Sequence, residues 1–276
     1  MQRRPFGPSR VMVPIIGQGT WTMERHRKES IAALRRGLDL GMTRIDTAEM
    51  YGGGAVEEVV GEAIRGRRDE VFLVSKVLPS NASYRGMVEA CERSLRRLRT
   101  HWLDVYLLHS PSYHPFEDTV KGFRRLVDEG KIRAFGVSNF DGDLLDEAIA
   151  LGRPEGVACD QVLYHLGNRW IEHGLIDHCL TMDVSVVGYS PFGQGDFPED
   201  DPVLQQIAAA HNATPRQVAL RFLVRLPGTF TIPKSSTVAH VEENAGAAEV
   251  TLTPDEIARI DAAFPLGPVG AGLPRL

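Results

Sequence analysis

Residues 103–137 read LDVYLLHSPSYHPFEDTVKGFRRLVDEGKIRAFGV and contain the alternation on which the fold depends. The first six residues form a short, mostly apolar and β-forming run, which is typical of a buried strand. Phe116, Val120 and Phe123 then recur at helical spacing, and Gly130 follows them, a residue type that commonly ends a helix. A second apolar run closes the segment. Strand, helix and strand in this order predict one βαβ unit of a parallel sheet.

The same alternation continues along the chain, with a new strand about every 25–30 residues. The glycine cluster at residues 52–54 lacks the GxGxxG spacing of a dinucleotide-binding Rossmann fold, and no linker interrupts the series. We therefore expect an α/β fold: a single (β/α)8 TIM-barrel domain over residues 1–276, with a short N-terminal β-hairpin and an extra C-terminal helix. The eight expected barrel strands span residues 15–19, 43–46, 71–76, 103–108, 132–137, 157–161, 184–189 and 229–232.

The composition is that of an ordinary globular protein, with 43% hydrophobic residues and a formal net charge of -5. This mild acidity argues against a nucleic-acid partner or an anionic membrane surface. The sequence has neither an apolar run of about 18 residues that could span a membrane nor an apolar N-terminal stretch typical of a signal peptide. Cys91, Cys159 and Cys179 are far apart and form no CxxC motif, so we expect three small buried side chains in a cytoplasmic protein rather than disulfides or a metal site.

Two further patterns could suggest sites that we do not expect. His165, His173 and His178 are close in sequence, but a spacing of five puts the last two on different faces of a helix, so no metal site is predicted. The arginines within residues 93–99 surround an amphipathic helix near acidic residues and are interpreted as a solvated face.

Titratable side chains follow three neighbouring strands at the point where each strand ends. Asp46 ends the second expected strand, Lys76 ends the third and His109 follows the fourth, while Tyr51 lies five residues beyond Asp46. The C-terminal ends of barrel strands share one rim, where the active sites of this fold lie. Hydride addition to a carbonyl builds negative charge on oxygen, which a tyrosine can protonate if a buried ammonium stabilises its phenolate. A carboxylate would hold that ammonium, and an imidazole would orient the carbonyl or relay a proton.

Six motifs accompany these four residues, hereafter the tetrad, in a fixed order. They are GQGTW at 17–21, DTAEMY at 46–51, GVSNF at 136–140, DQV at 160–162, YSP at 189–191 and IPKS at 232–235. Together with Ser75-Lys76 and the LLH at 107–109, they make nearly the whole chain similar to the aldo-keto reductase family. Within that family, QGTW, DTAEMY and the LYHL at 163–166 most resemble the bacterial methylglyoxal and small-aldehyde reductases.

The resemblance implies a catalytic role for each member of the tetrad. Tyr51 would be the general acid, and Lys76 would be the cation that favours its proton transfer. Asp46 would anchor Lys76, and His109 would orient the substrate carbonyl.

The resemblance also implies a nicotinamide cofactor, NADPH, with NADH as the alternative. Ser138, Asn139 and Gln161 would hold its carboxamide, which needs both donors and acceptors, and Tyr189 would stack on the ring. The segment 234–244 would bind the adenosine end, since it offers a cation and hydroxyls and opens a helix. The remaining residues expected to bind the cofactor are Gly19, Thr20, Trp21, Asp46, Ser190, Pro191, Phe192, Pro233, Lys234, Ser235, Thr237, His240, Glu243 and Asn244.

His240 is a departure from many relatives, which have an arginine six residues after the lysine. An imidazole binds a 2′-phosphate less firmly than a bidentate guanidinium does. For this reason we expect NADPH as the cofactor but keep NADH as an alternative.

The expected substrate-binding residues are Trp21, Tyr51, Leu78, His109 and Ser110. Several relatives have tryptophan at the two positions that Leu78 and Ser110 occupy here. Since no long C-terminal extension is expected to cover the site, we expect an open pocket with Trp21 as its main aromatic wall.

These observations predict an NAD(P)H-dependent oxidoreductase that reduces small aldehydes or ketones, including 2-oxoaldehydes, and acts as a monomer or weak dimer. Two alternatives remain. The tetrad works equally in the direction of alcohol or sugar oxidation, and a regulatory barrel could bind the cofactor with little turnover. The intact tetrad argues against the second alternative.

Overall fold

The computed structural model describes residues 1–154, 156–270 and 272–275. Its main sheet contains eight parallel strands, and each overlaps one of the eight runs expected from the sequence. Their order across the sheet follows their order in the chain, as successive βαβ units require. The strands are β3 (Gln18–Gly19), β4 (Arg44–Asp46), β5 (Phe72–Val77), β6 (Leu103–Leu108), β7 (Ile132–Ser138), β8 (Cys159–Leu163), β9 (Ser185–Tyr189) and β10 (Thr229–Thr231).

The two ends of this sheet meet each other. Parallel bridges join Ile16 to Thr231 and Gly19 to Lys234. Gly19 permits the close approach, because a Cβ at this position would lie 2.6 Å from the Ile232 carbonyl oxygen. A parallel sheet that curls back onto its own first strand agrees with the (β/α)8 expectation.

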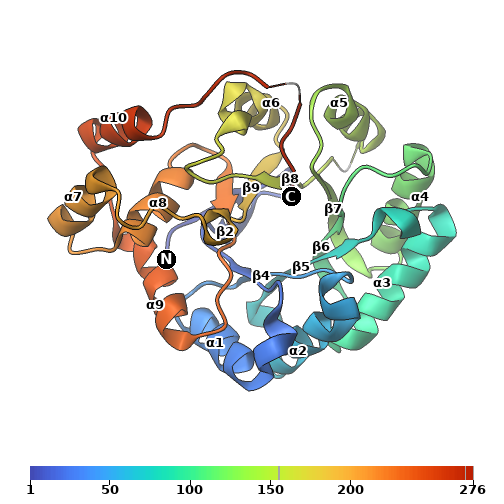
Figure 1. The fold of residues 1–276 in the computed structure, drawn as a ribbon. Coiled ribbons are helices and arrows are strands. Elements are labelled where there is room, and N and C mark those ends of the chain that lie inside the picture. Colours follow the sequence, from blue (N-terminus) through green and yellow to red (C-terminus); the bar gives the residue numbers. More distant parts are fainter. Residues whose placement is uncertain (155, 271, 276) are drawn as a thin grey trace.

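Helices alternate with the strands and surround the sheet, as the ring of coiled ribbons in Figure 1 shows. In α4 the expected apolar positions Val120 and Phe123 are buried. The expected C-terminal helix is α10, which begins at a capping box formed by Thr253 and Glu256. The helices are α1 (Arg27–Asp39), α2 (Ala55–Ala63), α3 (Tyr84–Leu98), α4 (Phe116–Asp128), α5 (Gly142–Leu151), α6 (Leu175–Thr181), α7 (Pro202–Ala210), α8 (Pro215–Leu223), α9 (Val238–Gly246) and α10 (Pro254–Ala263).

The expected N-terminal hairpin is formed by β1 (Arg3–Phe6) and β2 (Val11–Pro14), which pair antiparallel. Phe6 is buried and packs edge-on against Phe72 and Phe230, with ring centroids 5.2 and 5.0 Å away. Both partners lie near the N-terminal ends of their strands. The hairpin therefore covers the end of the sheet opposite to the rim where an active site is expected.

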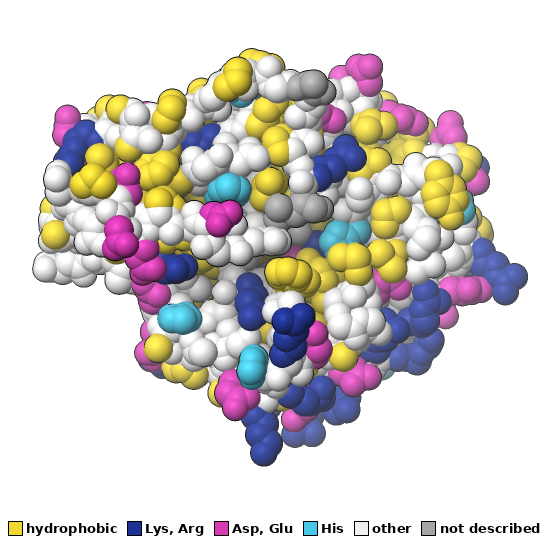
Figure 2. Space-filling view, viewed as in Figure 1, with side chains coloured by type: hydrophobic (Ala, Val, Ile, Leu, Met, Phe, Trp, Pro, Cys, Tyr) yellow, Lys and Arg dark blue, Asp and Glu magenta, His cyan; other side chains and the backbone are white. Residues whose placement is uncertain are grey.

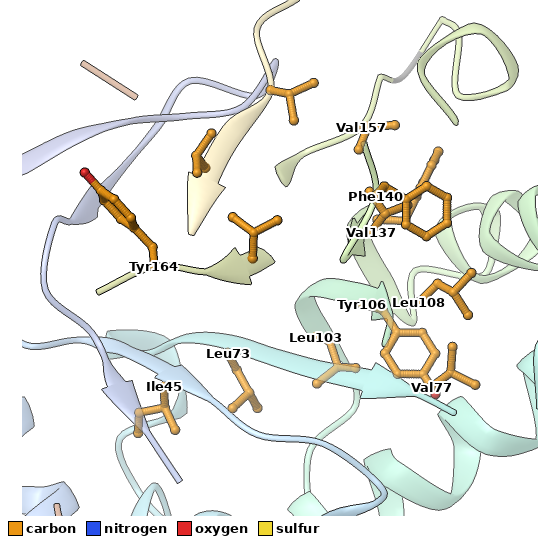
Figure 3. Close-up of a cluster of buried hydrophobic side chains, with 14 of the residues drawn as sticks. Ile45, Leu73, Val77, Leu103, Tyr106, Leu108, Val137, Phe140, Val157 and Tyr164 are labelled. Carbon is orange, nitrogen blue, oxygen red and sulfur yellow. The ribbon is translucent and has the colours of Figure 1, made fainter. Parts of the chain in front are cut away.

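Apolar side chains of the strands form an extensive core with the surrounding helices, part of which Figure 3 shows, including Ile45, Leu73 and Leu103. All three cysteines are free and buried, as the sequence predicts. Among the described residues, no helix combines the length and the apolar character needed to cross a membrane.

Candidate active site

The parallel register brings the strand ends to one rim, where they line a cavity of about 570 Å³. Asp46, the last residue of β4, is paired with Gly19, while Lys76 of β5 is paired with Leu107. Figure 2 shows a hollow near the middle of the face seen in Figure 1, with basic, histidine and hydrophobic side chains at its edge.

The tetrad residues lie together at this cavity. The Lys76 ammonium donates to Asp46 Oδ1 at 2.5 Å, to the Thr47 carbonyl at 2.9 Å and to the Tyr51 hydroxyl at 3.4 Å. The rings of Tyr51 and His109 meet edge-on, with centroids 5.8 Å apart. Lys76 and Asp46 are buried, and Tyr51 is partly exposed to the cavity.

The loop after β4 carries Tyr51 to this position. The short 3-10 helix η2 (Tyr51–Gly54) contains Gly52, Gly53 and Gly54, whose φ angles are 56°, 60° and 99°. These left-handed conformations favour glycine. The glycine cluster that fails the Rossmann pattern thus shapes the turn next to the candidate acid.

Burial alone would lower the pKa of Lys76, but the adjacent Asp46 carboxylate and Tyr51 hydroxyl raise it above its ordinary value. Lys76 is therefore a cation at neutral pH. Burial and the Lys76 charge together lower the pKa of His109 to about 3, so this imidazole is neutral over the physiological range. It can orient a carbonyl but does not carry a charge to it.

The second oxygen of Asp46 has partners of its own. Gln161 of β8 donates to Asp46 Oδ2 at 2.7 Å, and the guanidinium of Arg44 lies 3.6 Å from the same oxygen. Arg44 is absent from the residues expected at the site. A signal was present in the sequence, because a strand residue two positions before Asp46 shares its face of the sheet.

The polar residues expected to hold a carboxamide form a connected group. Ser138 donates to the Gln161 carbonyl at 2.7 Å, and the Tyr189 hydroxyl donates to Asn139 Oδ1 at 3.0 Å. Asn139 adopts a left-handed conformation with φ of 62°. Such backbone strain in a non-glycine residue is typical of functional sites.

Most of the residues expected to bind cofactor line the cavity, and most of the others lie on the segment that leads into α9 or in α9 itself. Thr237 occupies the N-cap position of α9, and Ser235 accepts a hydrogen bond from the Thr237 amide at 3.1 Å. Those that line the cavity are Gly19, Thr20, Trp21, Asp46, Ser138, Asn139, Gln161, Tyr189, Ser190, Pro191 and Lys234; those that do not are Phe192, Pro233, Ser235, Thr237, His240, Glu243 and Asn244.

All five expected substrate-binding residues line the cavity, including Leu78 and Ser110. Arg275 is one of five lining residues that were not expected, together with Met50, Pro79, Gln194 and Ile232. Its guanidinium donates to the Asn139 carbonyl at 3.0 Å, and the nearby Leu273 amide donates to Asp141. In Figure 1 the C-terminal segment runs from α10 and turns inward toward the middle of the ring. The cavity is therefore partly bounded by a C-terminal segment, which the sequence-based expectation left out.

The histidine group within residues 165–178 does not form a metal site. No cluster of metal-ligating side chains exists among the residues that the structure describes. His178 instead contacts Asp146 at 2.8 Å.

Comparison with known proteins relates this site to a family. The sequence model of the Aldo/keto reductase family matches residues 15–264. The chain belongs to the aldo/keto reductase family. Methylglyoxal reductase YeaE of Escherichia coli is 46% identical over 92% of both chains, and glyoxal reductase of Bacillus subtilis is 34% identical over 91% of this chain and 89% of its own.

The fold of this aldo/keto reductase is shared with solved structures. An aldo-keto reductase from Klebsiella pneumoniae, crystallised with NADPH, has a TM-score of 0.95 and 42% identity, with 100% of this chain and 99% of that chain covered. The resemblance inferred from the sequence motifs is confirmed at the level of the family and of its methylglyoxal reductase relatives.

Proposed function

We propose that residues 1–276 form a single (β/α)8-barrel domain that reduces small aldehydes and 2-oxoaldehydes with NADPH. The observation that carries the proposal is the Lys76 ammonium, which lies between the Asp46 carboxylate and the Tyr51 hydroxyl at the edge of a cavity. This arrangement suits protonation of an oxygen on which negative charge develops.

The residues present fit a nicotinamide cofactor. Ser138, Asn139 and Gln161 offer amide and hydroxyl groups at consecutive strand ends, and Tyr189 adds an aromatic ring at the same edge. Lys234 lies before the N-terminus of α9, where a phosphate would be favoured. When bound, the cofactor would supply the hydride.

Tyr51 would supply the proton to the carbonyl oxygen. Its phenolate would be stabilised by Lys76, which Asp46 holds in place through a direct hydrogen bond. Neutral His109 would hold the carbonyl oxygen by a hydrogen bond, because its lowered pKa keeps the ring uncharged.

The substrate preference rests on the walls of the cavity and on the relatives. Leu78 and Ser110 offer little flat aromatic surface, and Trp21 is half exposed at the rim. Small dicarbonyls would lose little binding affinity in the absence of an aromatic wall, since hydrogen bonds to Tyr51 and His109 would hold them. Two relatives are named for methylglyoxal and glyoxal reduction, which agrees with this preference.

Every tetrad member comes from one chain, so the proposed activity needs no partner subunit, and we expect a monomer or weak dimer. Free buried cysteines fit the reducing cytoplasm.

The proposal is tested by following NADPH and NADH oxidation with a panel of carbonyls that ranges from methylglyoxal to steroids. We expect fastest turnover with methylglyoxal-like dicarbonyls and activated aromatic aldehydes, and a preference for NADPH. Turnover only with alcohols or sugars in the oxidative direction would replace the proposal with a dehydrogenase. Cofactor binding without turnover of any substrate would replace it with a regulatory role.

A further inference from the structure

Arg44 is a buried cation next to the proposed catalytic group, and the proposed mechanism gives it no role. It lies in β4 two residues before Asp46, and its side chain is fully buried. Its guanidinium packs against two aromatic rings, 5.1 Å from the centroid of Phe6 and 5.9 Å from that of Phe230. Gly17 leaves room for it, since a Cβ there would approach the Arg44 side chain to 3.2 Å.

A purely structural role does not explain this residue. None of the three guanidinium nitrogens has a hydrogen-bonding partner among the described residues. Its contact with Asp46 Oδ2 is an ion pair of 3.6 Å, which is too long for a hydrogen bond. A buried charge with an incomplete set of partners is costly to the folded state, and a buried ion pair is by itself weak evidence for a stabilising role.

The charges around Arg44 are few. Burial lowers the pKa of Arg44 and the Asp46 carboxylate opposes that lowering; a guanidinium stays protonated in proteins. From β8, Cys159 faces it as a neutral thiol, because burial raises the pKa of this group to about 12. On the Tyr51 side, His109 is neutral as well. The charged groups of the cluster are therefore Asp46, Lys76 and Arg44.

These three charges form an ordered series. Lys76 contacts one oxygen of Asp46 and Arg44 contacts the other. Without Arg44, the carboxylate that holds Lys76 would also cancel most of the positive potential that Lys76 exerts on Tyr51. With Arg44, the buried cluster keeps a net positive charge beside the Tyr51 hydroxyl.

We propose that Arg44 is a positioning residue that holds Asp46 from inside the barrel and offsets its charge, so that Lys76 stabilises the phenolate of Tyr51. This inference deepens the proposed function and rests on it. Arg44 touches neither substrate nor cofactor and acts through Asp46.

The test compares Arg44→Met, which removes the charge at similar length, with Arg44→Lys, which keeps it. The pH dependence of kcat is measured for methylglyoxal reduction and for oxidation of the product alcohol. In Arg44→Met we expect the alkaline midpoint of both profiles to rise by about 0.5–1 pH unit, the scale of one charge at this range in a protein interior. Oxidation at neutral pH should then fall about three- to tenfold, because the phenolate is the proton acceptor in that direction. Arg44→Lys should recover most of the shift.

A second measurement does not depend on turnover. The ionisation of Tyr51 is followed by ultraviolet difference spectroscopy, with Tyr51→Phe in each background as the subtraction. If no carbonyl is reduced, the proposed function fails, but this titration still decides whether Arg44 acts on Tyr51.

Stability separates the proposal from a structural role. We expect the Tm of Arg44→Met to change little, because Asp46 keeps its hydrogen bonds with Lys76 and Gln161 and is not left as an unpaired buried charge. A lower Tm together with an unchanged ionisation midpoint of Tyr51 would overturn the proposal. Unchanged midpoints of the pH profiles at an unchanged Tm would also overturn it. If Arg44→Met does not fold, Arg44→Gln replaces it in the comparison with Arg44→Lys, and equal midpoints in those two variants would overturn the proposal.

Discussion

The two ends of the eight-stranded sheet differ in what they contain. At the N-terminal end, Phe6 of the hairpin packs on Phe72 and Phe230, and apart from Arg44 the buried side chains of this cluster are apolar. At the C-terminal end the same strands finish in the tetrad and the cavity, where Asn139 and Ser190 have left-handed backbone conformations. The packed end is mainly apolar, and the end with the cavity is polar.

The change takes place within one or two residues of a strand. On one face of two strands, Val74 and Leu107 belong to the cluster that contains Phe6, and two residues later Lys76 and His109 belong to the site. The comparison predicts that substitutions at the rim mainly change chemistry and that substitutions of apolar side chains at the base mainly change stability. Arg44 is the exception at the base, because its proposed role is to act on the rim.

The largest effect is expected for Tyr51→Phe at the rim. This variant loses the proposed proton donor but keeps the ring, so kcat should fall between about a hundredfold and ten-thousandfold, the range for lost general acid catalysis. Cofactor affinity and Tm should hardly change. Steady-state kinetics with methylglyoxal and cofactor titration provide the measurement.

Tyr106→Phe is the matched control, because Tyr106 is fully buried in β6 and its hydroxyl has no hydrogen-bonding partner among the residues described. Its kcat should equal that of the wild type. Near-normal turnover of Tyr51→Phe would show that the tetrad assignment is wrong.

At the base, Ile15→Ala should have the opposite effect. Ile15 is fully buried in the cluster that contains Phe6. Its truncation should lower the free energy of unfolding by about 2–5 kcal/mol, as for other buried aliphatic residues. The kcat of the folded protein should stay within about twofold of the wild type, since no rim residue loses a contact. A large loss of kcat at full folding would show that base and rim are coupled.

Lys234→Ala should act on cofactor choice, with a smaller effect than the first two variants. If Lys234 meets a 2′-phosphate, the Kd for NADPH should rise about tenfold while that for NADH stays nearly constant, because a charge-assisted contact is lost. Lys121→Ala, which removes an exposed lysine paired with Asp118 on α4, is the control. Equal effects on both cofactors would show that Lys234 does not contact that phosphate. His240→Arg should tighten NADPH binding by a few-fold.

His109 should make the protein sensitive to acid. Its folded-state pKa of about 3 lies below the ordinary 6.5, so the unfolded chain binds a proton that the folded chain does not. Stability is therefore lost as pH falls below 6.5, by roughly 1 kcal/mol between pH 6.5 and 5.5. Denaturant unfolding at both pH values should show that His109→Gln removes this loss.

The control for this measurement is His101→Gln, since His101 is exposed. It should leave the pH dependence as it is. An identical pH dependence in wild type and His109→Gln would mean that His109 is charged in the folded protein.

Ser110→Trp should have the smallest effect. An added aromatic wall should lower the KM for bulky aromatic aldehydes by about two- to fivefold, on the scale of one aromatic contact, and leave small dicarbonyls nearly unchanged. The measurement is kcat/KM over a series of substrates of increasing size in both proteins. A wild-type preference for steroids, or unchanged selectivity in the variant, would place the substrate wall elsewhere, in the loop at residues 192–197.

The positions of the strands and the grouping of the tetrad residues at one rim could be predicted from the sequence. Alternation of apolar strands and amphipathic helices is a local signal, and the strands it predicts are those observed. Parallel strands bring their C-terminal ends to one rim, so Asp46, Lys76 and His109 could be grouped by the position of each residue in its own strand.

Contacts between segments that are distant in the chain depend on the tertiary structure. The burial of Arg44 against Phe6 and Phe230 requires the hairpin and the last strand, and no periodicity in β4 indicates either. Likewise, Arg275 lines the cavity because the C-terminal segment turns inward after α10, where Leu273 and Arg275 contact Asp141 and Asn139. Local patterns fix which face of a strand or helix is apolar, whereas the path of a loop or terminus is set by the packing of the whole molecule.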